Sequence, residues 1–154
     1  MAGGLDSVHL RAIVQERRSN SEWLADRPDS LRVACLNTRS LQRHADDITS
    51  NIYLSACDVA IYTESRMQGQ AVPQQFRQQQ VFCASAPSTH NYVGGVAVIV
   101  SPHIHASQLS QTVLDTFQFV AVHVTHGELQ LNIAALYRSD MITTVGVGHV
   151  LKNK

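Results

Sequence analysis

The chain has 154 residues, of which 44% are hydrophobic, so it is long and apolar enough for one folded domain and is not disordered throughout. Its 12 lysines and arginines balance 12 aspartates and glutamates. This neutral balance excludes a general nucleic-acid coat, which carries a basic excess, but it does not exclude a nuclease whose metal ion supplies positive charge.

The first 30 residues are expected to precede the domain. Residues 5–24 have helical periodicity, and residues 25–30 form a predicted linker because Pro28 interrupts both helix and strand. We place the start of the domain at Leu31. No apolar run has the length of a signal peptide or a membrane span, so we expect a soluble, intracellular protein without a membrane partner. A nuclear location is compatible with the sequence but is not indicated by it.

From residue 31 onward, the hydrophobic pattern predicts strands interrupted by helical segments. Strands are predicted at 31–37, 58–63, 81–84 and 96–101, with a helix over 38–50 and a short helix around 74–78. Residues 116–125 and 129–138 predict a β-hairpin, in which Gly127 supplies the positive φ of a tight turn. The tail after residue 140 has weak helical potential. The order predicts an α/β layered domain with a mixed sheet, and not a doubly wound parallel sheet.

Polar residues stand at the ends of two predicted neighbouring strands. Asn37 ends the first strand and precedes the helix, and Glu64 directly follows the second strand. Because the carboxyl ends of such strands meet at one edge of a sheet, we expect the two side chains to lie side by side. Carboxylate and carboxamide oxygens suit Mg²⁺. Considered without a family resemblance, Asn37 is also compatible with the N-cap of the following helix. Glu64 is likewise compatible with an ordinary carboxylate in a loop.

Four short motifs occur in one order along the chain. They are Leu-Asn-Thr-Arg-Ser-Leu at 36–41, Thr-Glu at 63–64, Tyr-Val-Gly-Gly-Val-Ala-Val at 92–98, and Leu-Asn-Ile-Ala-Ala-Leu-Tyr-Arg-Ser at 131–139. With these motifs the sequence resembles the endonuclease/exonuclease/phosphatase superfamily, the fold of DNase I and the apurinic endonucleases. It looks most like the domains carried by mobile elements, such as non-LTR retrotransposons and Helitron-type polyproteins.

The resemblance implies a fold and a set of site residues. It implies that residues 31–139 form half of a four-layer α/β sandwich, with a mixed sheet and helices on its outer face, and that residues 140–154 do not match. By the same resemblance, Asn37 and Glu64 would bind Mg²⁺ or Mn²⁺, and Tyr137 would orient the scissile phosphate as a catalytic residue.

The implied partner is DNA, and the implied reaction is metal-assisted hydrolysis of a phosphodiester by water. Arg39 and Arg138 would contact the nucleic-acid backbone. An alternative interpretation treats Arg39 as part of a solvated helix face and Tyr137 as an aromatic at the rim of a sheet. The histidine pairs His103 and His105, and His123 and His126, are expected to be surface residues, because no third ligand has suitable spacing.

Two segments of the family pattern are not found. The sequence contains neither Gly-Asp-x-Asn after the tyrosine nor Ser-Asp-His, and residues 139–141 read Ser-Asp-Met. Acid–base groups contribute about 10²–10⁴-fold to catalysis, so we expect a truncated Mg²⁺-dependent DNA endonuclease domain that is inactive by itself. Whether the chain is an enzyme stays open. The alternative is a degenerate, non-enzymatic nuclease fold that binds nucleic acid or protein.

A further expectation concerns packing. Half of such a sandwich would supply about one sheet, whose inner apolar face would lack a partner. Large uncovered apolar patches lead to association, so we expect self-association through that uncovered face.

Overall fold

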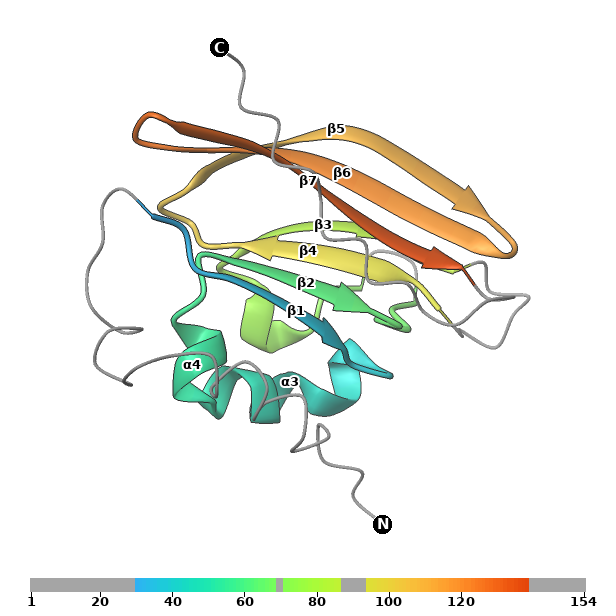
Figure 1. The fold of residues 1–154 in the computed structure, drawn as a ribbon. Coiled ribbons are helices and arrows are strands. Elements are labelled where there is room, and N and C mark those ends of the chain that lie inside the picture. Colours follow the sequence, from blue (N-terminus) through green and yellow to red (C-terminus); the bar gives the residue numbers. More distant parts are fainter. Residues whose placement is uncertain (1–29, 69–70, 87–93, 139–154) are drawn as a thin grey trace.

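The computed structural model describes residues 30–68, 71–86 and 94–138, in three layers. Two helices lie beneath a four-stranded sheet, and a three-stranded sheet lies on the opposite face of that sheet (Figure 1). The predicted helix at 5–24 and the tail after residue 140 lie outside the described residues.

The first part of the fold is a parallel strand pair joined by two helices. Strands β1 (Val33–Asn37) and β2 (Val59–Thr63) are parallel and in register from end to end. They are joined by α3 (Leu41–Ser50) and α4 (Ile52–Ser55). The predicted strands and the longer helix are confirmed. Helix α4 was not predicted: it is one turn long, and the side-chain oxygen of Asn51 caps it by accepting hydrogen bonds from the next turn.

The first sheet is completed by two antiparallel strands. After the 3₁₀ turn η1 (Gln74–Phe76), strand β3 (Gln80–Ala84) pairs with β4 (Val96–Val100), which also pairs with β2. The strand order is β1-β2-β4-β3, which confirms the predicted mixed sheet. All residues of β2 and β4 are buried, as expected for strands covered on both faces.

The second sheet is an antiparallel meander. It consists of β5 (His105–Leu114), β6 (Phe117–His126) and β7 (Leu129–Arg138), in that order. The predicted hairpin between β6 and β7 is confirmed, and Gly127 in its turn has a φ of 59°. Strand β5 was not predicted, because nearly all of its side chains are exposed and polar residues dominate its sequence.

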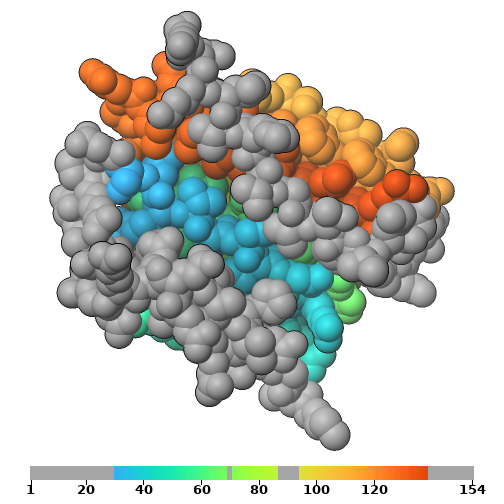
Figure 2. Space-filling view, viewed as in Figure 1, coloured from blue at the N-terminus to red at the C-terminus, as the bar shows by residue number. Residues whose placement is uncertain are grey.

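The two sheets pack face to face, so the expectation of a single sheet with an uncovered inner face is wrong. The alternate residues of β6 that point inward are buried against β4 and its neighbours, and atoms of the upper sheet lie directly on those of the lower one (Figure 2). Aliphatic side chains make up most of this core: Val59, Ile61, Val96, Val98, Val100, Ile104, Val120, Val122, Val124 and Ile133. The chain therefore covers that face by itself.

The helices cover the other face of the four-stranded sheet, which confirms the predicted outer helical layer. Leu41, Ala45 and Ile48 recur at helical spacing on one side of α3 and pack against β1 and β2. Leu54 of α4 joins the same core. None of the helices in the described ranges is long and apolar enough to cross a membrane.

An apolar strip remains on the outer face of the three-stranded sheet. The rings of Phe117 and Phe119 stack with their centroids 6.4 Å apart, and Leu114 beside them is 59% exposed. Self-association stays a prediction. The surface that would mediate it is now this outer face of the three-stranded sheet, because the inner face is covered.

Candidate functional site

The carboxyl ends of β1, β2 and β7 lie on the same side of the molecule (Figure 1). The parallel register places Asn37 beside Thr63, so the side chain of Glu64 follows at the same edge. The amide nitrogen Nδ2 of Asn37 donates a hydrogen bond to Oε1 of Glu64 at 3.0 Å. The expectation that these two side chains lie side by side is confirmed.

Asn37 is oriented by the turn that follows it. Its Oδ1 accepts a hydrogen bond from the backbone N–H of Arg39 at 3.2 Å, which turns the amide nitrogen toward Glu64. The N-cap of α3 is Ser40, whose hydroxyl accepts from the N–H of Arg43, so the interpretation of Asn37 as the helix cap is wrong. In this arrangement Asn37 holds the Glu64 carboxylate in place.

The segment after β2 has an unusual backbone. Glu64 and Arg66 have φ values of 50° and 49°, in the left-handed region that costs a residue with a side chain about 1 kcal/mol or more. The N–H groups of Ser65 and Arg66 donate to the carbonyls of Gly95 and Gly94 at 3.1 and 2.9 Å. These cross-strand hydrogen bonds hold the turn in a conformation that places both charged side chains at the strand ends.

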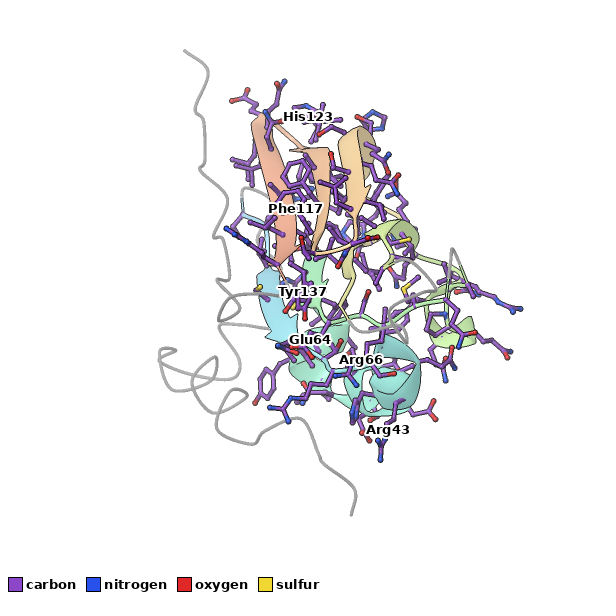
Figure 3. All side chains as sticks on the ribbon, turned by 90° about the vertical axis from the view of Figure 1, so that its right-hand side faces the viewer. Arg43, Glu64, Arg66, Phe117, His123 and Tyr137 are labelled. Carbon is purple, nitrogen blue, oxygen red and sulfur yellow. The ribbon has the colours of Figure 1, made fainter. Side chains whose placement is uncertain are left out.

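Arg66 is a site residue that the sequence analysis missed. Its Nη2 lies 3.2 Å from Oε2 of Glu64, and its side chain is 39% exposed. Figure 3 shows Arg66, Glu64 and Tyr137 gathered at this side of the molecule. The sequence signal was a basic residue two positions after Glu64, at the end of a predicted strand. Sequence patterns do not show that the backbone makes a left-handed turn there, so they do not predict the ion pair.

Buried polar atoms without partners are concentrated at this turn. In the described part of the chain, the buried side-chain atoms without a hydrogen-bond partner are Thr63 Oγ1, Ser65 Oγ and Arg66 Nε. Leaving such an atom unpaired costs about 1–3 kcal/mol, and native structures retain few of them. Their concentration within four consecutive residues distinguishes this segment from the rest of the described chain; the turn at Arg39 and Ser40 also has positive φ values but holds none of these atoms.

Tyr137 reaches the same site from the second sheet. It points inward from β7, and its ring lies so close to Gly94 that a Cβ atom at position 94 would be 2.6 Å from its Cε1. Burial raises the pKa of Tyr137, the Glu64 charge raises it further, and the Arg66 charge lowers it. The phenol is therefore within electrostatic reach of both charged residues.

Gln118 connects the second sheet to this turn and was also missed. It is fully buried; its Oε1 accepts from the N–H of Gly95 at 3.0 Å, and its Nε2 donates to the carbonyl of Leu114 at 2.8 Å. The sequence signal for a buried polar residue was that Gln118 shares a strand face with three valines, at positions 120, 122 and 124. Gln118 fixes the glycine pair that supports Ser65 and Arg66.

The two arginines predicted to bind nucleic acid lie in different places. Arg39 is exposed in the turn between β1 and α3, directly beside Asn37. Arg138 is exposed at the end of β7, and as the neighbour of Tyr137 it projects from the opposite face of the sheet. The structure therefore brings Arg39 to the site, whereas Arg138 faces away from it.

No protein-family model matches this sequence, and no curated protein matches it. The family resemblance therefore depends on the four sequence motifs.

The donor set at these strand ends fits a weakly held hard cation. Among the described residues, no group of three histidine, cysteine, aspartate or glutamate side chains could hold a metal ion. Glu64 is the one carboxylate placed beside Asn37 at these described strand ends, and Mg²⁺ is commonly bound by one or two carboxylates while water and phosphate oxygens supply the other ligands.

The four histidines of the two predicted pairs lie in the part of the chain that the structure describes, where no second metal-binding group is found. His103 is exposed and lies 3.2 Å from Asp58, with its ring 6.4 Å from that of His126. His123 lies on the outer face of β6, where its Nδ1 is 2.7 Å from Oδ1 of Asn132 (Figure 3). These contacts agree with the expected surface positions.

Proposed function

We propose that this chain belongs to a DNase I-like, Mg²⁺-dependent phosphodiesterase domain of the type carried by mobile elements, and that it binds a divalent cation together with DNA phosphate. The observation that carries the proposal is the hydrogen bond of 3.0 Å between Asn37 and Glu64 at the carboxyl ends of neighbouring parallel strands. Tyr137, which the motif pattern assigns to phosphate, adjoins the same site.

Each residue has a definite part in this proposal. Glu64 would bind the cation, and the phenol of Tyr137 would donate a hydrogen bond to a phosphate oxygen. Asn37, which the motif pattern assigns to the metal, would instead orient the Glu64 carboxylate, because its Oδ1 already accepts from the N–H of Arg39. Arg39, exposed beside Asn37, would contact the phosphate backbone. The cation would stabilise negative charge on the phosphoryl oxygens.

Binding, and not hydrolysis, is the activity that we assign to these residues. In-line attack by water requires a group that takes its proton, and Asn37, Glu64 and Tyr137 are not the aspartate and histidine to which the resemblance assigns proton transfer. The non-enzymatic alternative, a nuclease fold that only binds nucleic acid, differs in one respect: its DNA affinity would not depend on a cation at Glu64.

Cation titration of matched carboxylate variants tests the proposal. Wild type is expected to bind Mn²⁺ in calorimetry, and E64Q is expected to bind it at least about tenfold more weakly, because the ligand charge is removed. E128Q is the control, since Glu128 is exposed in the turn between β6 and β7 and loses the same charge. Equal Mn²⁺ affinity of E64Q and wild type would contradict the assignment.

A DNA arm separates the two candidate functions. A short fluorescent DNA duplex should bind wild type more tightly when Mn²⁺ is present, and binding should weaken as salt rises because phosphate contacts release counterions. DNA binding that is the same with and without Mn²⁺, in wild type and in E64Q, would favour the non-enzymatic binding module.

A further inference from the structure

Glu64 already has a cation beside it. Its Oε1 accepts from Asn37 at 3.0 Å, and its Oε2 lies 3.2 Å from Nη2 of Arg66, while the carboxylate is only 17% exposed. Both oxygens are therefore engaged within the protein. A divalent ion that binds Oε2 would therefore compete with Arg66 for this oxygen.

We propose that Arg66 is an internal counter-ion that occupies the cation position on Glu64, and that binding of a divalent cation displaces it toward a DNA phosphate. The inference rests on the proposed function and adds to it a residue that the motif pattern does not assign. It predicts that Arg66 opposes cation binding and favours phosphate binding.

The pairing of Arg66 with Glu64 is incomplete, which makes displacement feasible. A guanidinium has five N–H donors and typically pairs with a carboxylate through two parallel hydrogen bonds. Here Nη2 makes one contact, and Nε is buried without a partner among the described residues. Because the side chain is 39% exposed, its charged end can leave Glu64 without crossing the core.

Electrostatic repulsion explains why a bound divalent cation would displace Arg66. Two cations that share one carboxylate oxygen repel each other strongly at the few ångströms involved, so a bound divalent ion and Arg66 cannot both remain on Oε2. The planar guanidinium matches the geometry of a phosphate group, which a DNA backbone supplies at the same strand ends. Displaced from Glu64, Arg66 would use the donors that are now unpaired.

The main test measures two affinities in each variant. R66Q is expected to bind Mn²⁺ about three- to tenfold more tightly than wild type, because the competing charge is gone. In saturating Mn²⁺, R66Q should bind the DNA duplex about three- to tenfold more weakly, because a charged phosphate contact is removed. R66K, which retains the charge, should keep the Mn²⁺ affinity of wild type.

Arg77 provides the matched control. It is exposed after η1 and carries the same charge, so R77Q should change the Mn²⁺ affinity by less than about twofold. A purely structural role for Arg66 would weaken both ligands in R66Q, whereas the proposed role moves the two affinities in opposite directions. A charge that stays in place would also do so, and the displacement itself is therefore measured on the Arg66 signal of wild-type protein.

Wild-type protein supplies an independent measurement. In ¹⁵N NMR spectra, the Arg66 Nε–H signal, assigned by its disappearance in R66K, should shift on addition of Mg²⁺ and saturate together with a calorimetric isotherm recorded with Mg²⁺. An Mn²⁺ affinity of R66Q equal to or below that of wild type, or an Nε–H signal that does not respond to Mg²⁺, overturns the inference and leaves the proposed function standing. Absence of Mn²⁺ binding in wild type and R66Q alike overturns the proposed function, and the inference with it.

Discussion

The two ends of strand β2 each hold a carboxylate, in contrasting surroundings. Asp58, just before the strand, is 5% exposed and accepts from the backbone N–H and the Nε of Arg32 at 2.8 and 3.4 Å, with His103 3.2 Å from its other oxygen. Glu64, just after the strand, lies on a left-handed backbone and accepts from two side chains.

The difference separates a carboxylate held by the backbone from one held only by side chains. Asp58 joins the start of β2 to the residue before β1, through a hydrogen bond from a backbone N–H that is fixed in place by the fold. Around Glu64 the hydrogen bonds come from side chains that can rotate, and the neighbouring buried polar atoms are unpaired. Strain and unpaired groups are retained where a fold has a use for them, which supports the assignment of Glu64 to binding.

The largest expected effect is therefore at Asp58. D58A should lower the free energy of unfolding by about 3 kcal/mol, because it removes the buried acceptor of the hydrogen bonds from the backbone N–H and the Nε of Arg32. E64A should change it by less than about 1 kcal/mol, since it removes two side-chain hydrogen bonds at a partly exposed site. Urea unfolding of D58A and E64A measures the two changes in the free energy of unfolding. Equal destabilisation would show that the two carboxylates contribute alike to the stability of the fold.

A smaller effect is expected at the glycine pair that supports the Glu64 end. G94A should destabilise by about 2 kcal/mol, because Gly94 has a φ of 94° and a new Cβ would lie 2.6 Å from the Tyr137 ring. G127A is the control: Gly127 also has a positive φ, 59°, but lies in an exposed hairpin turn, where alanine costs about 1 kcal/mol. Urea unfolding measures both values. If G94A destabilises the protein no more than G127A does, the Tyr137 ring leaves room for a side chain at position 94.

Sequence alone predicted the parts of the fold whose burial is regular. Strand β4 is apolar throughout and β2 is apolar apart from Thr63, so both left the signal of a continuous apolar run, whereas the β6–β7 hairpin left an alternating signal on either side of Gly127. Strand β5 left none, because its side chains are mostly exposed. The packing of β6 on β4 was also beyond prediction: alternation indicates that a strand has an apolar face, but not which face covers it.

The candidate site divides in a similar way. The proximity of Asn37 and Glu64 followed from sequence, because consecutive parallel strands end at one edge of a sheet. The positions of Arg66 and Gln118 did not follow. The first depends on a left-handed turn, and the second depends on a hydrogen bond to Gly95, which is 23 positions away in the chain.

The smallest effect, and the most specific to the Glu64 end, is in the pH dependence of stability. The pKa of Tyr137 is raised in the fold, first by burial and then by Glu64, so the unfolded chain loses this proton at a lower pH than the folded protein does. The stabilising contribution is complete below the unfolded pKa of about 10 and is lost as pH rises from there through the folded pKa. Y137F should therefore lose less stability than wild type across this alkaline range. In E64Q the ultraviolet titration of the phenol should move to lower pH, since the nearby negative charge is gone. Identical alkaline unfolding profiles for wild type and Y137F would mean that the fold does not raise the pKa of this phenol, and an unchanged titration in E64Q would mean that the phenol is not held beside Glu64.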